Sequence, residues 1–306
     1  MQHDQYKYIS RCDGLELDVL EIQPLSQPKG IIQFLHGMAE NKERYIETME
    51  FFARNGYITI IHDHRGHGKS IRDLADQGYF YDDTGKFILY DAHDITRMIK
   101  AKYPGLAIYL FGHSMGALIG QNYLKNYDNE VQKLILSGMP GNNPLCSTAI
   151  GLVTILEKIK GSYHHSKLIQ NLSVGTYDKK FKGENKNCWL SANPENVNLY
   201  NVDINCGFTF TLNGFKNLFL LMKNAYSDTD WVKTNLNLPI LYLAGENDPV
   251  IMTKEDWRRA QLFLNKIGYT YVKGKMYHHM RHEILHEVRK EVVMQDILSF
   301  IENETA

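Results

Sequence analysis

The chain has 306 residues, 43 % of them hydrophobic and 23 % charged, which allows one large globular domain or two modest ones with an ample core. Its formal charge of -1, from 34 basic and 35 acidic side chains, gives no global attraction to nucleic acid. No run approaches the ~18 apolar residues that a bilayer-spanning helix needs, no secretory signal is visible, and the four cysteines have no paired spacing, so we expect free thiols and a cytoplasmic protein whose membrane contact is at most peripheral.

The first half of the chain alternates between strand and helix patterns. Residues 15–22 alternate apolar and polar side chains with period two, as in a half-buried strand, and residues 31–35 form a short apolar run, as in a fully buried one. Further strands are expected at 57–61, 107–111 and 133–137, and helices at 45–55, 91–102 and 115–126. This alternation predicts an α/β fold with a mostly parallel sheet and helices on both faces.

The alternation stops between residues 140 and 212, where turn clusters, a basic stretch and one amphipathic helix near 149–160 replace it. It resumes with helices expected at 215–226, 254–267 and 283–301 and strands at 240–244 and 269–273. A block without the pattern between two blocks that have it predicts an insertion over one edge of the sheet. We therefore expect a single α/β domain, 1–306, that carries a cap at about 140–212.

The segment 112–116, Gly-His-Ser-Met-Gly, stands where a predicted strand becomes a helix. A G-x-S-x-G turn in this context exposes a serine as a nucleophile, and the helix N-terminus offers free N–H groups to a developing oxyanion. A glycine-rich turn that binds phosphate is the alternative. The context favours Ser114 as a nucleophile, which then requires an acid and a histidine further along the chain.

Two later loops supply these groups. Asp248 follows the strand predicted at 240–244, with Glu246 as a rival carboxylate and a simple turn before proline as the alternative role. The loop after the next strand contains three histidines, of which His282 is preferred because it lies at the predicted start of the last helix. The neighbouring His278 and His279 are then expected to cap the loop or to lie on its surface without a catalytic role, and His286 is expected on the final helix.

Five motifs in this order resemble the α/β-hydrolase superfamily, and within it the monoacylglycerol lipase and lysophospholipase branch. They are His-Gly-Met-Ala-Glu-Asn at 36–41, Asp-His-Arg-Gly-His-Gly-Lys-Ser at 63–70, the segment 112–116, Ala-Gly-Glu-Asn-Asp-Pro at 244–249 and Arg-His-Glu-Ile-Leu at 281–285. The resemblance runs from about residue 15 to 300 and is weakest between 145 and 200. The family often has Asn-Glu where this chain has His286-Glu287, a departure outside the triad.

The resemblance implies a catalytic triad of Ser114, Asp248 and His282 that works without a cofactor. It also implies an oxyanion hole made by the backbone N–H groups of Met38 and Met115. The implied activity is hydrolysis of a lipid ester, a monoacylglycerol or a lysophospholipid. An acyltransferase, a thioesterase, a peptidase or a binding protein that has lost the reaction remain as alternatives on the same fold.

Substrate contacts are expected from His36 and, in the insertion, from Ile150, Val153 and Phe208, although these side chains could instead pack the cap onto the sheet. Residues 157–186 hold seven lysines against three acids, which predicts either affinity for an anionic headgroup or membrane surface, or a solvated face. The histidines at 63–70 are interpreted as part of a sharp loop, so no metal is expected. The sequence makes no prediction of the oligomeric state.

Overall fold

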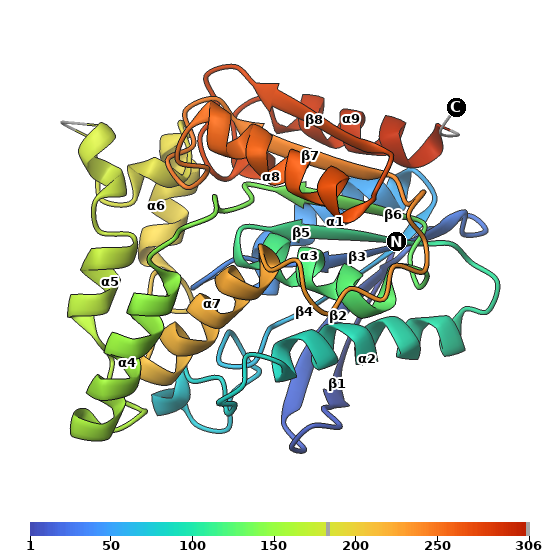
Figure 1. Ribbon diagram of the computed structural model, residues 1–306. Coiled ribbons are helices and arrows are strands. Elements are labelled where there is room, and N and C mark those ends of the chain that lie inside the picture. The colour runs from blue at the N-terminus through green and yellow to red at the C-terminus, as the bar shows by residue number, and fades with distance from the viewer. Residues whose placement is uncertain (182–183, 304–306) are drawn as a thin grey trace.

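Eight strands form one sheet in the order β1-β2-β4-β3-β5-β6-β7-β8 in the computed structural model, which describes residues 1–181 and 184–303 (Figure 1). The strands from β4 to β8 in this order run parallel to one another. β2 pairs antiparallel with β4 on one side and with the edge strand β1 on the other. The strands are β1 Gln2–Ile9, β2 Glu16–Gln23, β3 Gly30–Leu35, β4 Tyr57–His62, β5 Ile108–His113, β6 Lys133–Ser137, β7 Ile240–Gly245 and β8 Val272–Tyr277.

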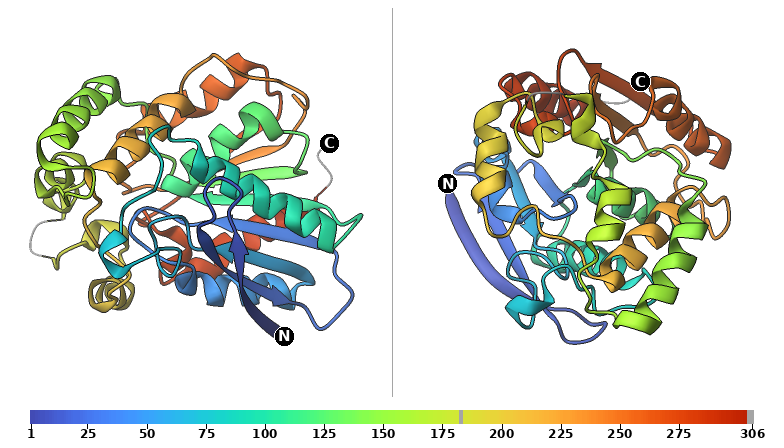
Figure 2. Two further views of the ribbon diagram at one scale, coloured as in Figure 1. Left: turned by 90° about the horizontal axis from the view of Figure 1, so that it is seen from below. Right: turned by 90° about the vertical axis from the view of Figure 1, so that its left-hand side faces the viewer.

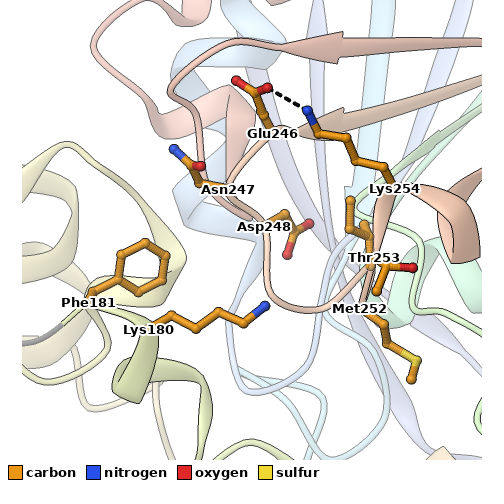
Figure 3. Close-up of a pocket in the computed structure, with 9 residues that line it drawn as sticks. Lys180, Phe181, Glu246, Asn247, Asp248, Met252, Thr253 and Lys254 are labelled. Carbon is orange, nitrogen blue, oxygen red and sulfur yellow. Dashed lines mark hydrogen bonds and ion pairs between the residues drawn. The ribbon is translucent and has the colours of Figure 1, made fainter.

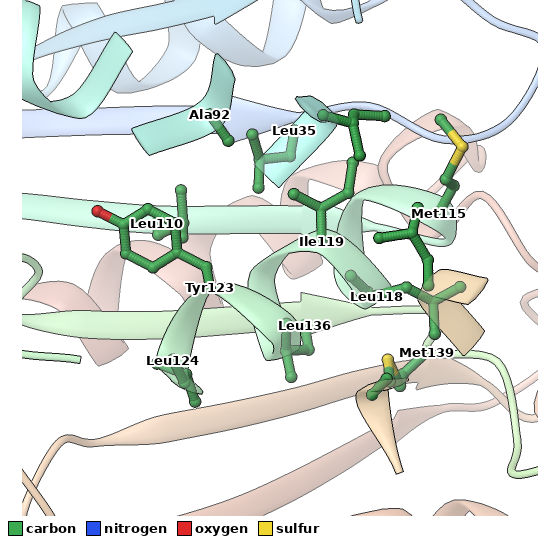
Figure 4. Packing of buried hydrophobic residues seen from close by; sticks show 14 of the residues in the cluster. Leu35, Ala92, Leu110, Met115, Leu118, Ile119, Tyr123, Leu124, Leu136 and Met139 are labelled. Atoms are coloured by element: carbon green, nitrogen blue, oxygen red, sulfur yellow. The ribbon is translucent and has the colours of Figure 1, made fainter. Parts of the chain in front are cut away.

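Helices cover both faces of this sheet because successive residues of the buried strands point to opposite sides. Ile32 and Phe34 of β3 pack with α1 (Ile46–Arg54) and α9 (Lys290–Glu302). Ile31 and Leu35 of the same strand belong to the core on the other face, which contains residues of α2 (Phe87–Lys102), α3 (Met115–Tyr127) and α8 (Lys254–Ile267). Figure 4 shows α3 side chains, among them Leu118 and Tyr123, packed over this second face.

The predicted α/β class is confirmed, and most predicted elements match the observed ones within a few residues. The N-terminal strand β1 was not predicted, because it lies at the edge of the sheet and its side chains are polar and largely exposed. β8 begins three residues later than the strand predicted at 269–273. Tyr269 is instead buried before the strand and donates a hydrogen bond from its hydroxyl to Asp128 Oδ2.

The helix predicted at 283–301 is wrong over its first seven residues. A single 3-10 turn occupies Ile284–His286, and the helix α9 begins at Lys290. Two acidic side chains hold the intervening chain out of helical geometry: Glu283 pairs with Arg44, and Glu287 accepts hydrogen bonds from the backbone N–H groups of Ala192 and Arg281. His286 therefore lies in this turn, partly buried, and not on the final helix.

The segment between β6 and α7 (Leu212–Ala225) contains three α-helices, where the sequence predicted one. They are α4 (Cys146–Lys160), α5 (Lys167–Ser173) and α6 (Pro194–Val202). The helix α6 escaped prediction because its first turn, capped by the Asn193 side chain with Pro194 at the first position, resembles a loop in sequence. Figures 1 and 2 show α4, α5, α6 and α7 gathered at one end of the sheet; we call residues 140–211 the cap.

Candidate active site

Ser114 stands on the tight turn that joins β5 to α3. Its backbone has φ 55° and ψ -114°, a strained region for a residue with a side chain, and such outliers gather at functional sites. The glycines on either side permit the turn: a Cβ at Gly112 would lie 2.3 Å from the carbonyl oxygen of Gly116, and a Cβ at Gly116 would lie 2.0 Å from that of Leu35. The two glycines therefore allow β5, α3 and the end of β3 to approach closely around one serine.

His282 and Asp248 lie together, in the loops after β8 and β7. Nδ1 of His282 donates a hydrogen bond of 2.9 Å to Oδ2 of Asp248, and the two residues are 2 % and 3 % exposed. Burial by itself lowers the pKa of His282, but the negative charge of Asp248 and this hydrogen bond outweigh it, and the pKa lies above its usual value. The pair is thus a buried imidazole, oriented and made more basic by a carboxylate.

The rival side chains form a separate pair at the surface. Glu246 contacts His278 and makes an ion pair of 2.6 Å with Lys254. Figure 3 shows Glu246 and Lys254 among the residues that line a cavity of about 340 Å³, which Asp248 also lines. His278 is largely exposed, so this pair has none of the shielding that surrounds His282. The geometry thus separates Asp248 from Glu246, which the sequence pattern alone left as competitors.

Ser114 and His282 line the same cavity, which has a volume of about 770 Å³ and lies between the carboxyl ends of the strands and the cap. Two aromatic neighbours that the sequence analysis missed pack on the His282 ring, with centroid separations of 4.6 Å for His113 and 5.2 Å for Trp189. Burial lowers the pKa of His113 to about 4, so this ring stays neutral beside His282. Trp189 comes from the cap, which thereby contacts the imidazole directly.

The backbone amides expected to form the oxyanion hole are free. Met38, in the loop after β3, and Met115, the first residue of α3, both line the cavity that contains Ser114. Neither N–H group makes a hydrogen bond to any residue in the described part of the chain. Two free donors beside a serine hydroxyl are the arrangement that stabilises a tetrahedral oxyanion.

His36 does not contact the cavity, contrary to the sequence expectation. The ring is fully buried behind the loop, where Nδ1 donates to the Gly37 carbonyl oxygen at 2.8 Å and Nε2 accepts from the backbone N–H of His64 at 2.9 Å. Burial holds the pKa of His36 at about 3, which keeps Nε2 available as an acceptor. His36 therefore shapes the loop that carries Met38 and is not a substrate contact.

The three cap residues predicted to bind substrate also face elsewhere. Val153 is fully buried in the core, Ile150 packs partly buried against it, and Phe208 packs against His67 and Phe210 with ring separations of 5.3 and 5.8 Å. The apolar side chains that do line the cavity come from adjacent faces of the cap helices and from α3 and α7. Among them are Leu118, Leu145, Ala149, Leu152, Ile169, Leu172, Leu218, Phe219 and Met222.

Across residues 1–181 and 184–303, no group of three or more His, Cys, Asp or Glu side chains is arranged to hold a metal ion. Asp63 instead accepts hydrogen bonds from the backbone N–H and the Nζ of Lys42. The described cysteines are all free thiols, as predicted.

No helix in the described ranges is long and apolar enough to cross a membrane. Of the seven lysines at 157–186, Lys182 lies outside the described residues.

A strained serine on a strand-to-helix turn, a buried His–Asp pair and a mostly parallel sheet together define the α/β-hydrolase class. Residues 26–289 match the model of the Hydrolase_4 family, described as serine aminopeptidase, S33. The chain belongs to this family.

Similar proteins share most of their length with this chain. A probable lysophospholipase L2 of Haemophilus influenzae is 26 % identical over 92 % of this chain and 85 % of its own length, and the human monoglyceride lipase is 26 % identical over 98 % and 91 %. Among solved structures, a thermostable carboxyl esterase from Bacillus coagulans in complex with glycerol has a TM-score of 0.89 and 27 % identity, and covers 98 % of each chain.

Proposed function

We propose that this protein, a carboxylic ester hydrolase, cleaves the ester of a single-chain lipid, a monoacylglycerol or a lysophospholipid, through an acyl-enzyme formed on Ser114. One observation carries this proposal: Ser114 and His282 open into a cavity of about 770 Å³ whose lining is rich in aliphatic side chains. A pocket of this size accommodates one long acyl chain next to the nucleophile. Relatives named as monoglyceride lipase and lysophospholipase support the same substrate class.

The proposed reaction uses the His–Asp pair as a proton shuttle. Ser114 Oγ attacks the ester carbonyl carbon while its proton passes to His282 Nε2, and the Met38 and Met115 N–H groups stabilise the oxyanion. Asp248 holds Nδ1–H of His282, so that Nε2 is the nitrogen free to accept that proton. The C–O bond to the alcohol then breaks, His282 protonates the departing alkoxide, and a water molecule activated by His282 hydrolyses the acyl-enzyme.

The surface of the cap favours peripheral contact with a lipid surface. Leu152, Ile155 and Ile159 lie on one stripe of α4 and are 40 %, 58 % and 72 % exposed, and Leu168 and Leu172 on α5 are also exposed. Such an unpartnered apolar stripe favours association with a membrane or micelle. Leu152 and Leu172 also line the cavity, so a lipid leaving that surface would enter the site directly. Because free thiols are typical of a reducing compartment, we propose that the protein acts in the cytoplasm, on lipid presented at a membrane surface.

The test is hydrolysis of monoacylglycerols and lysophospholipids of matched acyl lengths, together with short p-nitrophenyl esters and an aminoacyl p-nitroanilide, by wild type and Ser114→Ala. We expect the wild type to cleave the long-chain lipids and Ser114→Ala to lose all of these activities. The ratio between the two headgroups identifies the substrate. Cleavage of the anilide alone would establish a peptidase instead, and undiminished activity in Ser114→Ala would refute the proposed nucleophile.

A further inference from the structure

A buried group of four polar side chains, outside the reacting groups, connects the three segments that meet at the site. We call it the Arg44 network; its members are Glu40, Arg44, Asn196 and Glu283. Arg44 is 9 % exposed and forms a bidentate pair with Glu283, in which Nη1 and Nη2 each donate to one carboxylate oxygen at 2.7 Å. Nη1 also donates to Glu40 Oε2 at 2.5 Å. One guanidinium thus holds two carboxylates in a fixed, planar arrangement.

The Glu40 end of the network fixes the loop that carries Met38. Glu40 Oε1 accepts a hydrogen bond from the backbone N–H of Gly37 and another, of 3.0 Å, from the Tyr45 hydroxyl. Gly37 immediately precedes Met38, which has a free N–H and lines the same cavity as Ser114. Because one peptide unit separates the two amides, the position of the Glu40 carboxylate sets the position of the Met38 amide.

The Glu283 end fixes the loop that carries His282. Glu283 is the next residue along the chain, and its backbone N–H donates to the Leu190 carbonyl oxygen of the cap at 2.7 Å. Burial by itself raises the pKa of Glu283, but the positive charge of Arg44 and its hydrogen bonds outweigh this and hold the pKa well below its usual range. Glu283 therefore remains an anion at neutral pH and keeps its pairing with Arg44.

The cap supplies the fourth member. Asn196 of α6 accepts a hydrogen bond of 3.0 Å from Nη2 of Arg44 and donates one of 2.7 Å to Oε2 of Glu283. One helical turn later, the ring of Tyr200 lies 5.0 Å from Arg44 Cζ, and its hydroxyl donates to the Ala39 carbonyl oxygen at 3.0 Å. The arrangement of the two loops and the seating of α6 therefore depend on the same guanidinium.

We propose that Arg44 is a positioning residue for ester hydrolysis, which holds the Met38 amide and the His282 ring in register when α6 of the cap is seated. This inference rests on the proposed function. A buried ion pair is a weak source of stability, because desolvation offsets its attraction, whereas a rigid bidentate group serves well to fix a geometry. Misplacement of a catalytic group by about 1 Å is enough to cost roughly 100-fold in rate.

The test compares Arg44→Lys with Arg65→Lys. Arg65 is a matched control because, like the largely buried Arg44, it lies inside the protein and pairs at 2.7 Å with a carboxylate, Asp91 of α2, but it does not contact the Arg44 network. We measure kcat and KM for a short p-nitrophenyl ester, the rate of labelling by a fluorophosphonate probe, and the Tm. When assayed well below its Tm, Arg44→Lys should show a kcat and a labelling rate roughly 10- to 100-fold lower than the wild type. Its KM should stay within about threefold of the wild-type value. Arg65→Lys should lower the Tm and keep the wild-type kcat.

Two further variants keep the inference testable if Arg44→Lys does not fold. Glu40→Gln keeps the shape of the side chain but weakens its bond to Arg44, and should lower kcat in the same manner. Asn196→Leu should lower kcat less, because it releases only α6. The double variant Arg44→Lys/Asn196→Leu should have the same kcat as Arg44→Lys alone. Wild-type labelling rates in these variants would overturn the positioning role while leaving the proposed function intact. A wild type that the probe does not label would overturn the proposed nucleophile, and the inference with it.

Discussion

At the scale of single residues, the site depends on backbone geometry that few side chains tolerate. Ser114 lies in a region of φ and ψ that costs about 1–3 kcal/mol. The structure sustains this because Ser114 N–H donates to the Ser137 carbonyl oxygen at 2.9 Å, and its own carbonyl oxygen accepts from Ala117 and Leu118. The turn is therefore held by its neighbours on β6 and α3, and a change in the distance between these elements should displace Ser114.

The first prediction concerns the glycine after the nucleophile. Gly116→Ala would place a Cβ 2.0 Å from the Leu35 carbonyl oxygen, so the start of α3 would have to move. We expect a loss of about 3 kcal/mol or more in the free energy of unfolding, together with loss of esterase activity. The matched control is Gly151→Ala, on the exposed side of α4 with no atom within 4 Å of its Cβ, which should gain about 0.5–1 kcal/mol. Denaturant unfolding of both variants makes the comparison, and an unaffected Gly116→Ala would disprove the close approach.

The second prediction concerns pH. In the proposed mechanism the imidazole of His282 must be neutral to accept the serine proton, and Asp248 raises its pKa above the usual value of about 6.5. The rate should therefore fall as the pH drops through a value above 6.5, as His282 becomes charged. In Asp248→Asn this acid limb should move to lower pH, and kcat should drop by up to about 10⁴-fold. A pH profile of kcat/KM for both proteins measures this, and an unshifted limb in Asp248→Asn would contradict the pairing.

At the scale of elements, two faces of α4 bear on the proposed function. One face lines the cavity, and a neighbouring stripe is exposed to solvent. Ile150 and Val153 were expected to contact substrate because they share one helical face, but apolar residues cover α4 on nearly all sides, so periodicity alone does not say which stripe faces the core. The packing of α4 against α7 decides this, and that contact is tertiary.

The third prediction tests the inner face. Leu152→Trp would fill part of the cavity, so activity on long acyl chains should fall at least tenfold relative to short p-nitrophenyl esters, which need less room. Leu262→Trp is the control, because Leu262 lies on α8 and is 54 % exposed. Hydrolysis rates over a series of acyl lengths give the comparison. Equal losses across that series would show that the acyl chain does not pass Leu152.

The fourth prediction tests the outer stripe. The double variant Ile155→Glu/Ile159→Glu should lose binding to lipid vesicles and keep its rate on a soluble short ester, because neither side chain lines the cavity. Leu262→Glu, with a similar exposure on α8, should bind vesicles as the wild type does. Co-sedimentation with vesicles, with and without anionic lipid, separates the apolar contribution from that of the lysines. Unchanged binding of the double variant would rule out α4 as the contact surface.

At the scale of the whole molecule, the histidines make folding sensitive to acid. His36, His62, His64 and His67 are buried around the end of β4, with ring centroids of successive neighbours 4.2 to 6.3 Å apart. Burial lowers the pKa of each, to about 3 for His36, His62 and His67. The unfolded chain therefore binds more protons than the folded one between about pH 6.5 and pH 3, and stability is lost as the pH falls through that window.

The fifth prediction isolates one of these rings. Neither ring nitrogen of His62 has a hydrogen-bond partner among the described residues, so His62→Phe removes a buried polar group without breaking a bond. Below pH 6, the slope of unfolding free energy against pH should become shallower by about 1.4 kcal/mol per pH unit, which corresponds to one proton. Denaturant unfolding at a series of pH values measures this slope. A slope equal to that of the wild type would mean that His62 is protonated in the folded state.

The sequence predicted the sheet well because local patterns of residues determine its strands, and the same local patterns gave the positions of the three proposed catalytic residues. Ser114 and Asp248 follow the short buried strands β5 and β7, and His282 lies in the loop after β8; parallel strands bring their carboxyl ends to one edge. The cap side chains were predicted poorly because their orientation depends on contacts between distant helices. The Arg44 network escaped for the same reason, since 239 residues separate Arg44 from Glu283, although Glu40 and Arg44 stand four residues apart near the first motif.

The two outermost strands carry a further consequence, for how copies of this chain meet one another. β1 and β8 close the two sides of the sheet, and each presents lysines: Lys7 on β1, and Lys273 and Lys275 on β8. Charged side chains on an unpaired strand discourage a second chain from adding to it, a common safeguard against runaway association. These lysines therefore disfavour edge-to-edge pairing at the two strands whose outer backbone groups have no neighbouring strand. The exposed apolar residues on α4 and α5 remain as a surface for association, and on the proposed membrane contact copies concentrated at a lipid interface would meet there.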